Sequence, residues 1–136
     1  MEDPARENSY EEAKRKAKEF YRGIGRVWCP ALNGYVAFNS AGFRHLVWKG
    51  AEQRPQKEQE RRFGLIFHAR NILAVHHGEV EFREKIEMSI VRKHGIKIRR
   101  PSRARFWGFL YERGGETITI VIRQIDRRSK HFFSIY

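Results

Sequence analysis

A histidine and a lysine four residues apart, His45 and Lys49, are the first side chains whose types and spacing could do chemistry. They fall in the segment Ala41–Lys49, whose apolar residues have helical spacing, so both would share one helix face with Arg44 beside them. A histidine that titrates near neutral pH can move a proton, and a neighbouring lysine can hold a phosphate. The alternative is a plain surface helix with soluble side chains, and spacing alone favours that alternative.

The end of the chain offers a second group of reactive side chains. Strand alternation over His131–Tyr136 predicts one face with Phe132, Ser134 and Tyr136, and an opposite face with His131, Phe133 and Ile135. Hydroxyls of Ser134 and Tyr136 on one side could bind a phosphate oxygen, while Phe133 and Ile135 would face the core. Arg123 interrupts an apolar strand and could clamp a phosphoryl transition state. An ordinary amphipathic strand, and an arginine that only reaches to the surface, remain the alternatives.

Positive charge is densest between Arg92 and Arg105, and Phe106–Trp107 follow at once. Basic residues interleaved with aromatic rings suit single-stranded nucleic acid, because rings stack on bases and arginines follow phosphates. A solvated loop followed by core aromatics is the alternative. The candidate RNA-binding residues are Arg44, Arg61, Arg62, Lys97, Arg99, Arg100, Arg103, Arg105 and Trp107.

Composition supports a polyanionic partner. The 136 residues include 28 Lys and Arg against 16 Asp and Glu, a formal net charge of +12. Such an excess attracts phosphate backbones, with acidic proteins as the other class of partner. Cys29 is the single cysteine, and adjacent His76 and His77 point to different sides, so we expect neither an intramolecular disulfide nor a metal or cofactor site. Without a signal peptide or long apolar run, the chain is expected to be cytoplasmic, with no membrane association.

The elements expected to position these residues are helices first and strands afterwards. We expect one domain over 1–136, with an N-terminal helix in 1–25, a helical half with a short hairpin in 26–78, and an antiparallel meander in 79–136. This order predicts an α+β fold with N-terminal helices packed on a curved antiparallel sheet of about four strands. The expected elements are helices at Glu2–Tyr21, Ala41–Lys49 (with Ser40 as N-cap) and Gln56–Val75, strands at Arg26–Cys29, Tyr35–Phe38, Arg105–Glu112, Thr117–Ile125 and Lys130–Tyr136, a period-two segment from Val80 to Ile90 interrupted at Glu84, and a basic loop at His94–Arg103.

Three segments together resemble the BECR superfamily, which joins barnase-like, EndoU-like, colicin-type and RelE-type ribonucleases. They are Tyr35–His45 leading into a helix, Arg61-Arg62-Phe63, and the closing Phe-Ser-Ile-Tyr. The resemblance covers about residues 28–136 and is greatest to the phage and mobile-element toxin-like branches. It implies a BECR fold with the family's helix histidine at His45, Lys49 one turn later, a strand arginine at Arg123 and a polar last-strand residue at Ser134. His131 departs from the pattern as a second histidine that could share or take over the proton transfers.

The resulting expectation is a metal-independent, toxin-like endoribonuclease that activates the RNA 2′-OH and leaves a 2′,3′-cyclic phosphate. Its catalytic candidates are His45, Lys49, Arg123, Ser134, His131 and Tyr136. Expected partners are RNA, with tRNA and mRNA both open as targets, and an acidic antitoxin or immunity protein. The alternatives are a non-catalytic RNA-binding protein and a protein-interaction module with an acidic partner.

Overall fold

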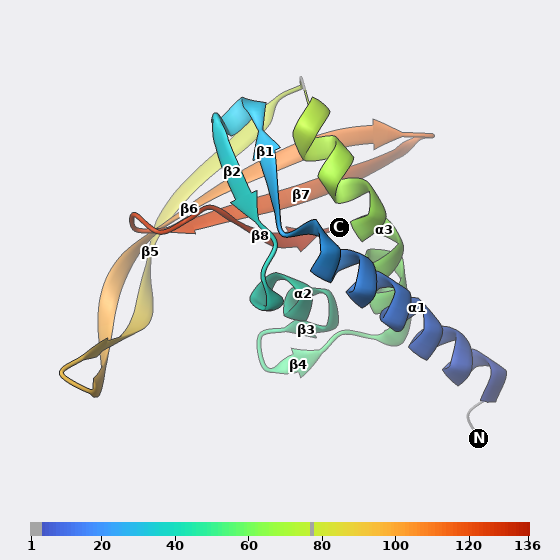
Figure 1. Ribbon diagram of the computed structural model, residues 1–136, viewed down its shortest axis with the longest axis horizontal. Coiled ribbons are helices and arrows are strands. Elements are labelled where there is room, and N and C mark those ends of the chain that lie inside the picture. The colour runs from blue at the N-terminus through green and yellow to red at the C-terminus, as the bar shows by residue number, and fades with distance from the viewer. Residues whose placement is uncertain (1–3, 77) are drawn as a thin grey trace.

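The computed structural model describes residues 4–76 and 78–136 as an α+β fold (Figure 1). Its helices are α1 (Pro4–Ile24), α2 (Ser40–Val47) and α3 (Gln56–Val75), with a short 3-10 helix at Pro30–Leu32. Its strands are β1 (Arg26–Cys29), β2 (Gly34–Ala37), β3 (Trp48–Lys49), β4 (Glu52–Gln53), β5 (Val80–Lys93), β6 (Ile96–Arg113), β7 (Glu116–Ile125) and β8 (His131–Ile135). None of the helices among these residues is both long enough and apolar enough to span a membrane.

The main sheet has six strands in the order β1-β2-β8-β7-β6-β5, so it is larger than the expected sheet of about four. The difference arises because the β1–β2 hairpin joins the same sheet through one parallel pair, Ala37 beside His131. All other neighbouring strands in this sheet are antiparallel, which makes the sheet mixed. The final strand β8 therefore lies inside the sheet, between the early hairpin and the later meander.

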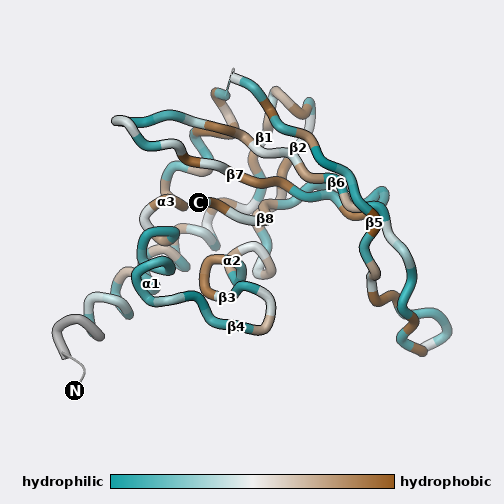
Figure 2. Tube along the Cα trace, turned by 180° about the vertical axis from the view of Figure 1, so that it is seen from behind, coloured by the Kyte–Doolittle hydropathy of each residue, from teal (hydrophilic) through white to brown (hydrophobic). Residues whose placement is uncertain are grey.

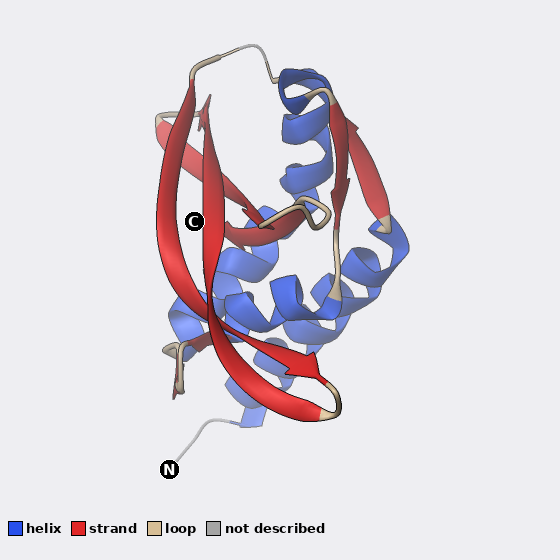
Figure 3. Ribbon diagram, turned by 90° about the vertical axis from the view of Figure 1, so that its left-hand side faces the viewer, coloured by secondary structure: helices blue, strands red, loops and turns tan. Residues whose placement is uncertain are grey.

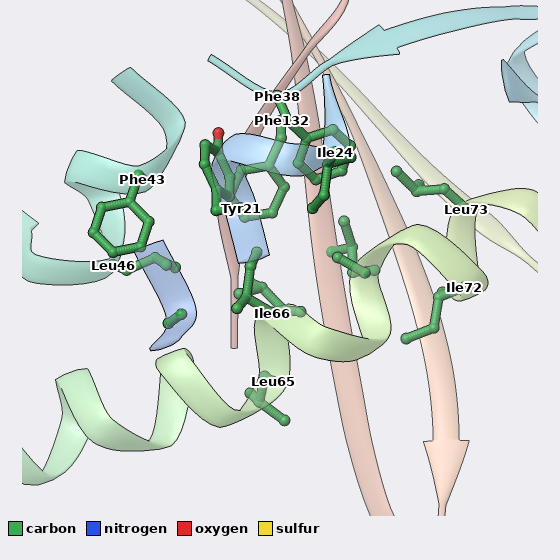
Figure 4. Close-up of a cluster of buried hydrophobic side chains, with 14 of the residues drawn as sticks. Tyr21, Ile24, Phe38, Phe43, Leu46, Leu65, Ile66, Ile72, Leu73 and Phe132 are labelled. Atoms are coloured by element: carbon green, nitrogen blue, oxygen red, sulfur yellow. The ribbon is translucent and has the colours of Figure 1, made fainter. Parts of the chain in front are cut away.

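One hydrophobic core joins the helices to the inner face of this sheet (Figure 4). The largest fully buried side chains include Phe63 of α3, Phe109 of β6 and Phe132 of β8. Tyr21 of α1 contacts the rings of Phe38, Phe43 and Phe132, which brings α1, α2 and β8 to one point. The Tyr21 hydroxyl donates to the Asn39 carbonyl at 2.6 Å, so its polar atom is satisfied inside the core.

Helix α2 is shorter than the sequence predicted, and its cap is a different residue. Asn39, not Ser40, is the N-cap: its side-chain oxygen accepts from the Gly42 N–H at 3.1 Å. The helix ends at Val47, and Trp48–Lys49 continue as β3, which pairs with β4. The prediction that Lys49 lies on the same helix as His45 is therefore wrong.

The two long strands β5 and β6 form a hairpin that extends well beyond the helices (Figures 1 and 3). Their register is regular from Val80 opposite Phe109 to Lys93 opposite Ile96, so the interruption expected at Glu84 is absent from this hairpin. Most of the expected basic loop is strand, with only His94 and Gly95 in the turn. The left-handed conformation of both turn residues closes the hairpin there.

The register shift occurs instead between β7 and β8, at Val121/Ile122. It changes the strict alternation expected for the last strand. Phe132 and Ile135 are fully buried, Ser134 is nearly so, and Phe133 is only half-buried. Ile135 thus faces the core as predicted, but the same prediction for Phe133 is wrong.

The close approach of α2 to β8 predicts that Gly42→Ala destabilises the fold. A Cβ atom at residue 42 would lie 2.7 Å from the Phe132 carbonyl oxygen and 2.8 Å from its ring. Because backbone cannot yield as a flexible side chain can, we expect a loss of about 1–3 kcal/mol in the free energy of unfolding. Urea unfolding measures it.

Gly64→Ala on α3 is the matched control, since a Cβ there meets nothing within 4 Å. It should stabilise the helix by roughly 0.5–1 kcal/mol. If the two substitutions changed the free energy of unfolding equally, the close contact between α2 and β8 would be contradicted.

Candidate active site

A histidine and an arginine meet at one aromatic ring, and a second histidine bonds to that arginine. His45 comes from α2, Arg123 from β7, and His131 and Phe133 from β8. The rings of His45 and Phe133 have centroids 4.3 Å apart, and the Arg123 guanidinium carbon lies 4.5 Å from the Phe133 centroid. Arg123 Nε donates to His131 Nε2 at 2.9 Å. We call these four residues the His–Arg cluster.

Strand register and the α2–β8 contact produce this arrangement. Arg123 and His131 lie directly opposite each other on β7 and β8, so their side chains leave the same face of the sheet. The register shift beside them leaves Phe133 half-buried, where it can contact both His45 and Arg123. Helix α2 then lies against β8 near Gly42, three residues before His45.

The environment of the cluster keeps its imidazoles neutral. Burial lowers the pKa of His45, and the positive charges of Arg123 and Arg54 lower it further, with smaller effects from His131 and Arg44. Burial also lowers the pKa of His131, again with Arg123 as the main charged neighbour. A neutral imidazole can accept a proton at neutral pH, as a general base must.

The hydrogen bond from Arg123 determines which nitrogen of His131 is protonated. Since Arg123 Nε can only donate, His131 Nε2 must accept, and the ring proton lies on Nδ1. His131 is therefore engaged in holding the arginine. His45 makes no ring hydrogen bond with any described residue, which leaves it the freer of the two imidazoles for a substrate proton.

A second polar network lies behind the cluster and holds the strand end in place. Arg62 is buried and donates to the Ser134 hydroxyl at 2.9 Å, to the Ile135 carbonyl at 3.0 Å and to Glu58 at 2.8 Å. Arg54 donates to the His45 carbonyl at 2.9 Å, which fixes the end of α2. Arg62 is thus a structural residue and not the RNA contact expected from sequence. The Ser134 hydroxyl is engaged by Arg62, and no described hydrogen bond joins it to the cluster.

A cavity of about 540 Å3 lies on the outer sheet face next to the cluster. Phe106 lines it and contacts Phe133 edge-on, with ring centroids 5.5 Å apart, while the Lys85 ammonium lies 5.3 Å from the Phe106 centroid. Tyr136, half-exposed, also lines this cavity, and the guanidinium carbon of Arg62 lies 5.8 Å from its ring centroid. The cavity offers an aromatic surface and a cation within reach of the His–Arg cluster.

The remaining predicted RNA-binding residues fall in several places. Trp107 packs partly buried against the core, beside Phe82, and so is not a free stacking surface. Arg44 and Arg61 are exposed on α2 and α3. The basic residues of β6 extend along the hairpin: Lys97, Arg99 and Arg100 are exposed, Arg100 lies 3.6 Å from Asp126, and Arg103 and Arg105 approach Glu84 at 2.8 Å and 3.9 Å.

Two residues of the site escaped the sequence reasoning. Phe133, taken for a core residue, is the ring that His45 and Arg123 share. Arg54 lies in a segment read only as a polar connector, yet it holds the last turn of α2. The sequence around Phe133 and Arg54 does not indicate these roles, because both arise from contacts between different elements of the fold.

Comparison with protein-family models, curated proteins and solved structures finds no match for this chain. Among the side chains of residues 8–76 and 78–136, no three of His, Cys, Asp or Glu gather as metal ligands would. His76 bonds to the Glu79 carbonyl, and His77 lies outside the described residues. The site is therefore interpreted from its own geometry.

The lowered pKa values of the two histidines predict a pH-dependent stability. Between the depressed values and the ordinary value of about 6.5, the unfolded chain binds more protons than the folded chain. Stability is therefore full above about pH 6.5 and falls as the pH drops through that value. Urea unfolding at about pH 7.5 and 5.5 measures the loss.

The variants His45→Gln and His131→Gln provide the comparison. Each removes one imidazole whose protonation is disfavoured in the folded protein. Each variant should lose less stability than the wild type over the same interval. An unchanged loss in both variants would show that other groups cause it.

Proposed function

We propose that the chain is a metal-independent endoribonuclease whose active site is the His–Arg cluster. The observation that carries the proposal is the meeting of His45 and Arg123 at the Phe133 ring, with His131 bonded to Arg123 and with burial and positive charge favouring the neutral form of both imidazoles. RNA supplies its own nucleophile, the 2′-OH, so a base and a positive clamp are the groups that the protein has to add.

In the proposed reaction His45 takes the proton of the 2′-OH. The 2′-oxygen then forms a bond to the adjacent phosphorus, the bond from phosphorus to the 5′-oxygen breaks, and solvent protonates the leaving oxygen. The products are a 2′,3′-cyclic phosphate and a free 5′-OH. A bound phosphate offsets the charges that depress the His45 pKa, so the imidazole gains basicity when substrate arrives.

Arg123 is assigned to the charge that develops on the phosphate. Its Nε is held by His131, which leaves its two terminal nitrogens free of that bond for non-bridging oxygens. Its contact with the Phe133 ring limits the directions in which it can point. His131 then acts as a positioning residue for Arg123, which is a more specific role than the shared proton transfer expected from sequence.

The proposal differs from the sequence expectation in its supporting residues. Lys49 lies on β3 outside helix α2, and Ser134 is bound to Arg62, so neither is assigned a catalytic role. Tyr136 and Lys85 line the adjacent cavity and suit a neighbouring base or phosphate. Toxin-like action, RNA as the partner, an acidic inhibitor and the BECR resemblance remain parts of the proposal.

His45→Ala should lower the rate of RNA cleavage by about 10²–10⁴-fold because the general base is lost. RNA affinity should change little, and the free energy of unfolding should fall by no more than about 1 kcal/mol. The measurement is single-turnover cleavage of a labelled RNA with and without EDTA, followed by analysis of the product ends.

His131→Ala is the control for the division of roles. It should weaken cleavage by releasing Arg123, and a variant lacking both His131 and Arg123 should be little worse than the Arg123→Ala variant alone. If the His45→Ala variant cleaved RNA normally and the His131→Ala variant were inactive, His131 would be the general base and His45 the positioning residue. RNA binding without cleavage by the wild type would favour the non-catalytic RNA-binding protein instead.

Binding to single-stranded RNA should weaken steeply with salt, since phosphate contacts release counterions. The double substitution of Lys97 and Arg99 by alanine should reduce the slope of log K against log salt by roughly 0.7 for each lost contact. Replacing Arg15 and Lys16, which pair with Glu12 on α1, removes the same charge and is the matched control. An equal slope in both double variants would remove the β5–β6 hairpin from the RNA-binding surface.

A further inference from the structure

Strand β5 is a long edge strand with nothing paired to its outer side. It ends the six-stranded sheet and runs for 14 residues, whereas the other edge strand, β1, has four. No described side chain bonds to its outer backbone groups, and no helix lies along its distal half (Figures 1 and 3). Natural proteins keep such edges short or covered, so an open edge of this length is a pairing surface.

The distal half of β5 exposes three large apolar side chains in one row. Ile86, Met88 and Ile90 alternate along the strand and are 65%, 56% and 65% exposed. Their spacing places all three on the same face of the hairpin. Figure 2 shows hydrophobic stretches along this part of the chain, away from the body of the molecule. Exposed apolar rows of this kind mark interaction sites on soluble proteins.

The charge of the hairpin lies on its inner strand and not on its edge. Strand β6 carries six basic residues and one acidic residue, but β5 carries four basic and three acidic residues. The edge that would meet a partner is therefore close to neutral, despite the net charge of +12 on the whole chain. Arg103 and Arg99 of β6 lie opposite Ile86 and Ile90, so a polyanion would contact β6. It would not supply the backbone N–H and C=O groups with which the open edge of β5 can pair, which argues against RNA as the occupant of this edge.

We propose that the occupant is a second copy of this chain, with β5 paired antiparallel to β5 about a two-fold axis at Met88. In that register Met88 faces the partner's Met88, and Ile86 faces the partner's Ile90. Glu84 faces the partner's Arg92, and the same pairs repeat on the other side of the axis. On this face the strand supplies a self-complementary pattern, with an apolar centre and an opposite-charge pair at each end. On the other face the same register brings Arg83 opposite the partner's Lys93, a like-charge pair that lies outside the apolar centre.

This register also explains the position of the flanking charges. Glu84 already lies 2.8 Å from Arg103 and 3.9 Å from Arg105 of its own chain, so the partner's Arg92 would give it a third cation. The basic side chains of β6 lie one strand further out on both sides of the row. The dimer therefore covers the apolar row and leaves Lys97 and Arg99 exposed for a polyanion.

Sedimentation equilibrium of the nucleic-acid-free full chain tests the proposal. The wild type should have twice the 16.2 kDa mass of one chain. Met88→Lys places two like charges at the axis and should raise the dimer dissociation constant by about 100-fold or more. Ile96→Lys is the matched control: Ile96 is 65% exposed, against 56% for Met88, but it lies on β6 and should leave the dimer intact.

A charge exchange tests the register itself. Glu84→Arg alone brings arginines together at both ends, and Arg92→Glu alone brings glutamates together, so each variant should be mainly monomeric. An equimolar mixture restores both opposite-charge pairs and should form heterodimers, although both variants carry a large net positive charge.

A monomeric wild type, a Met88→Lys variant that stays dimeric, or a mixture that stays monomeric would each overturn the proposal. The readout is mass, so these outcomes are independent of RNA cleavage. A wild type that becomes dimeric only when RNA is added would likewise overturn it, since RNA would then bridge the copies.

Discussion

The structure depends on the close contact between helix α2 and strand β8. Gly42 has no side chain, and this absence lets the helix lie against the Phe132 backbone and ring. Phe132 fills the core below, where it stacks with Phe38 and meets Tyr21. On the outer side the same contact brings His45 to Phe133, within reach of the charge of Arg123. The packing of α2 against β8 thus both stabilises the fold and positions the candidate active site.

Local sequence patterns predicted most helices and strands, but they failed where contacts between residues distant in the sequence determine the structure. Helix Gln56–Val75 and strand Arg26–Cys29 were predicted with the observed bounds, because apolar spacing and flanking Pro or Gly mark them. Lys49 was placed on a helix that ends two residues earlier, where β3 pairing takes over the backbone. Of the predicted site, His45, Arg123 and His131 do come together, but the burial of Ser134 depends on Arg62, 72 residues away. No local pattern could show that bond.

The electrostatics of the molecule separate into two regions with different consequences. Around the cluster, arginines surround half-buried imidazoles, so the charge favours the neutral histidine and a bound anion together. On the hairpin, the basic residues of β6 are well exposed beside a nearly neutral edge strand. The positive charge of the chain thus lies both in the compact His–Arg cluster and along the extended surface of β6. The apolar row of β5 belongs to neither region. That row is the reason to expect an assembly of two chains.

We propose that His45, His131 and Arg123 form a single phosphate-binding site. The most direct measurement is an NMR titration of the histidine ring protons with a dinucleotide that lacks the 2′-OH and cannot be cleaved. We predict that ligand raises the pKa of both His45 and His131, with one dissociation constant for both, because a bound phosphate offsets the positive charge of Arg123. If the ligand shifts only residues of the β5–β6 hairpin and leaves both imidazoles unchanged, the cluster is not the phosphate site and the account is contradicted.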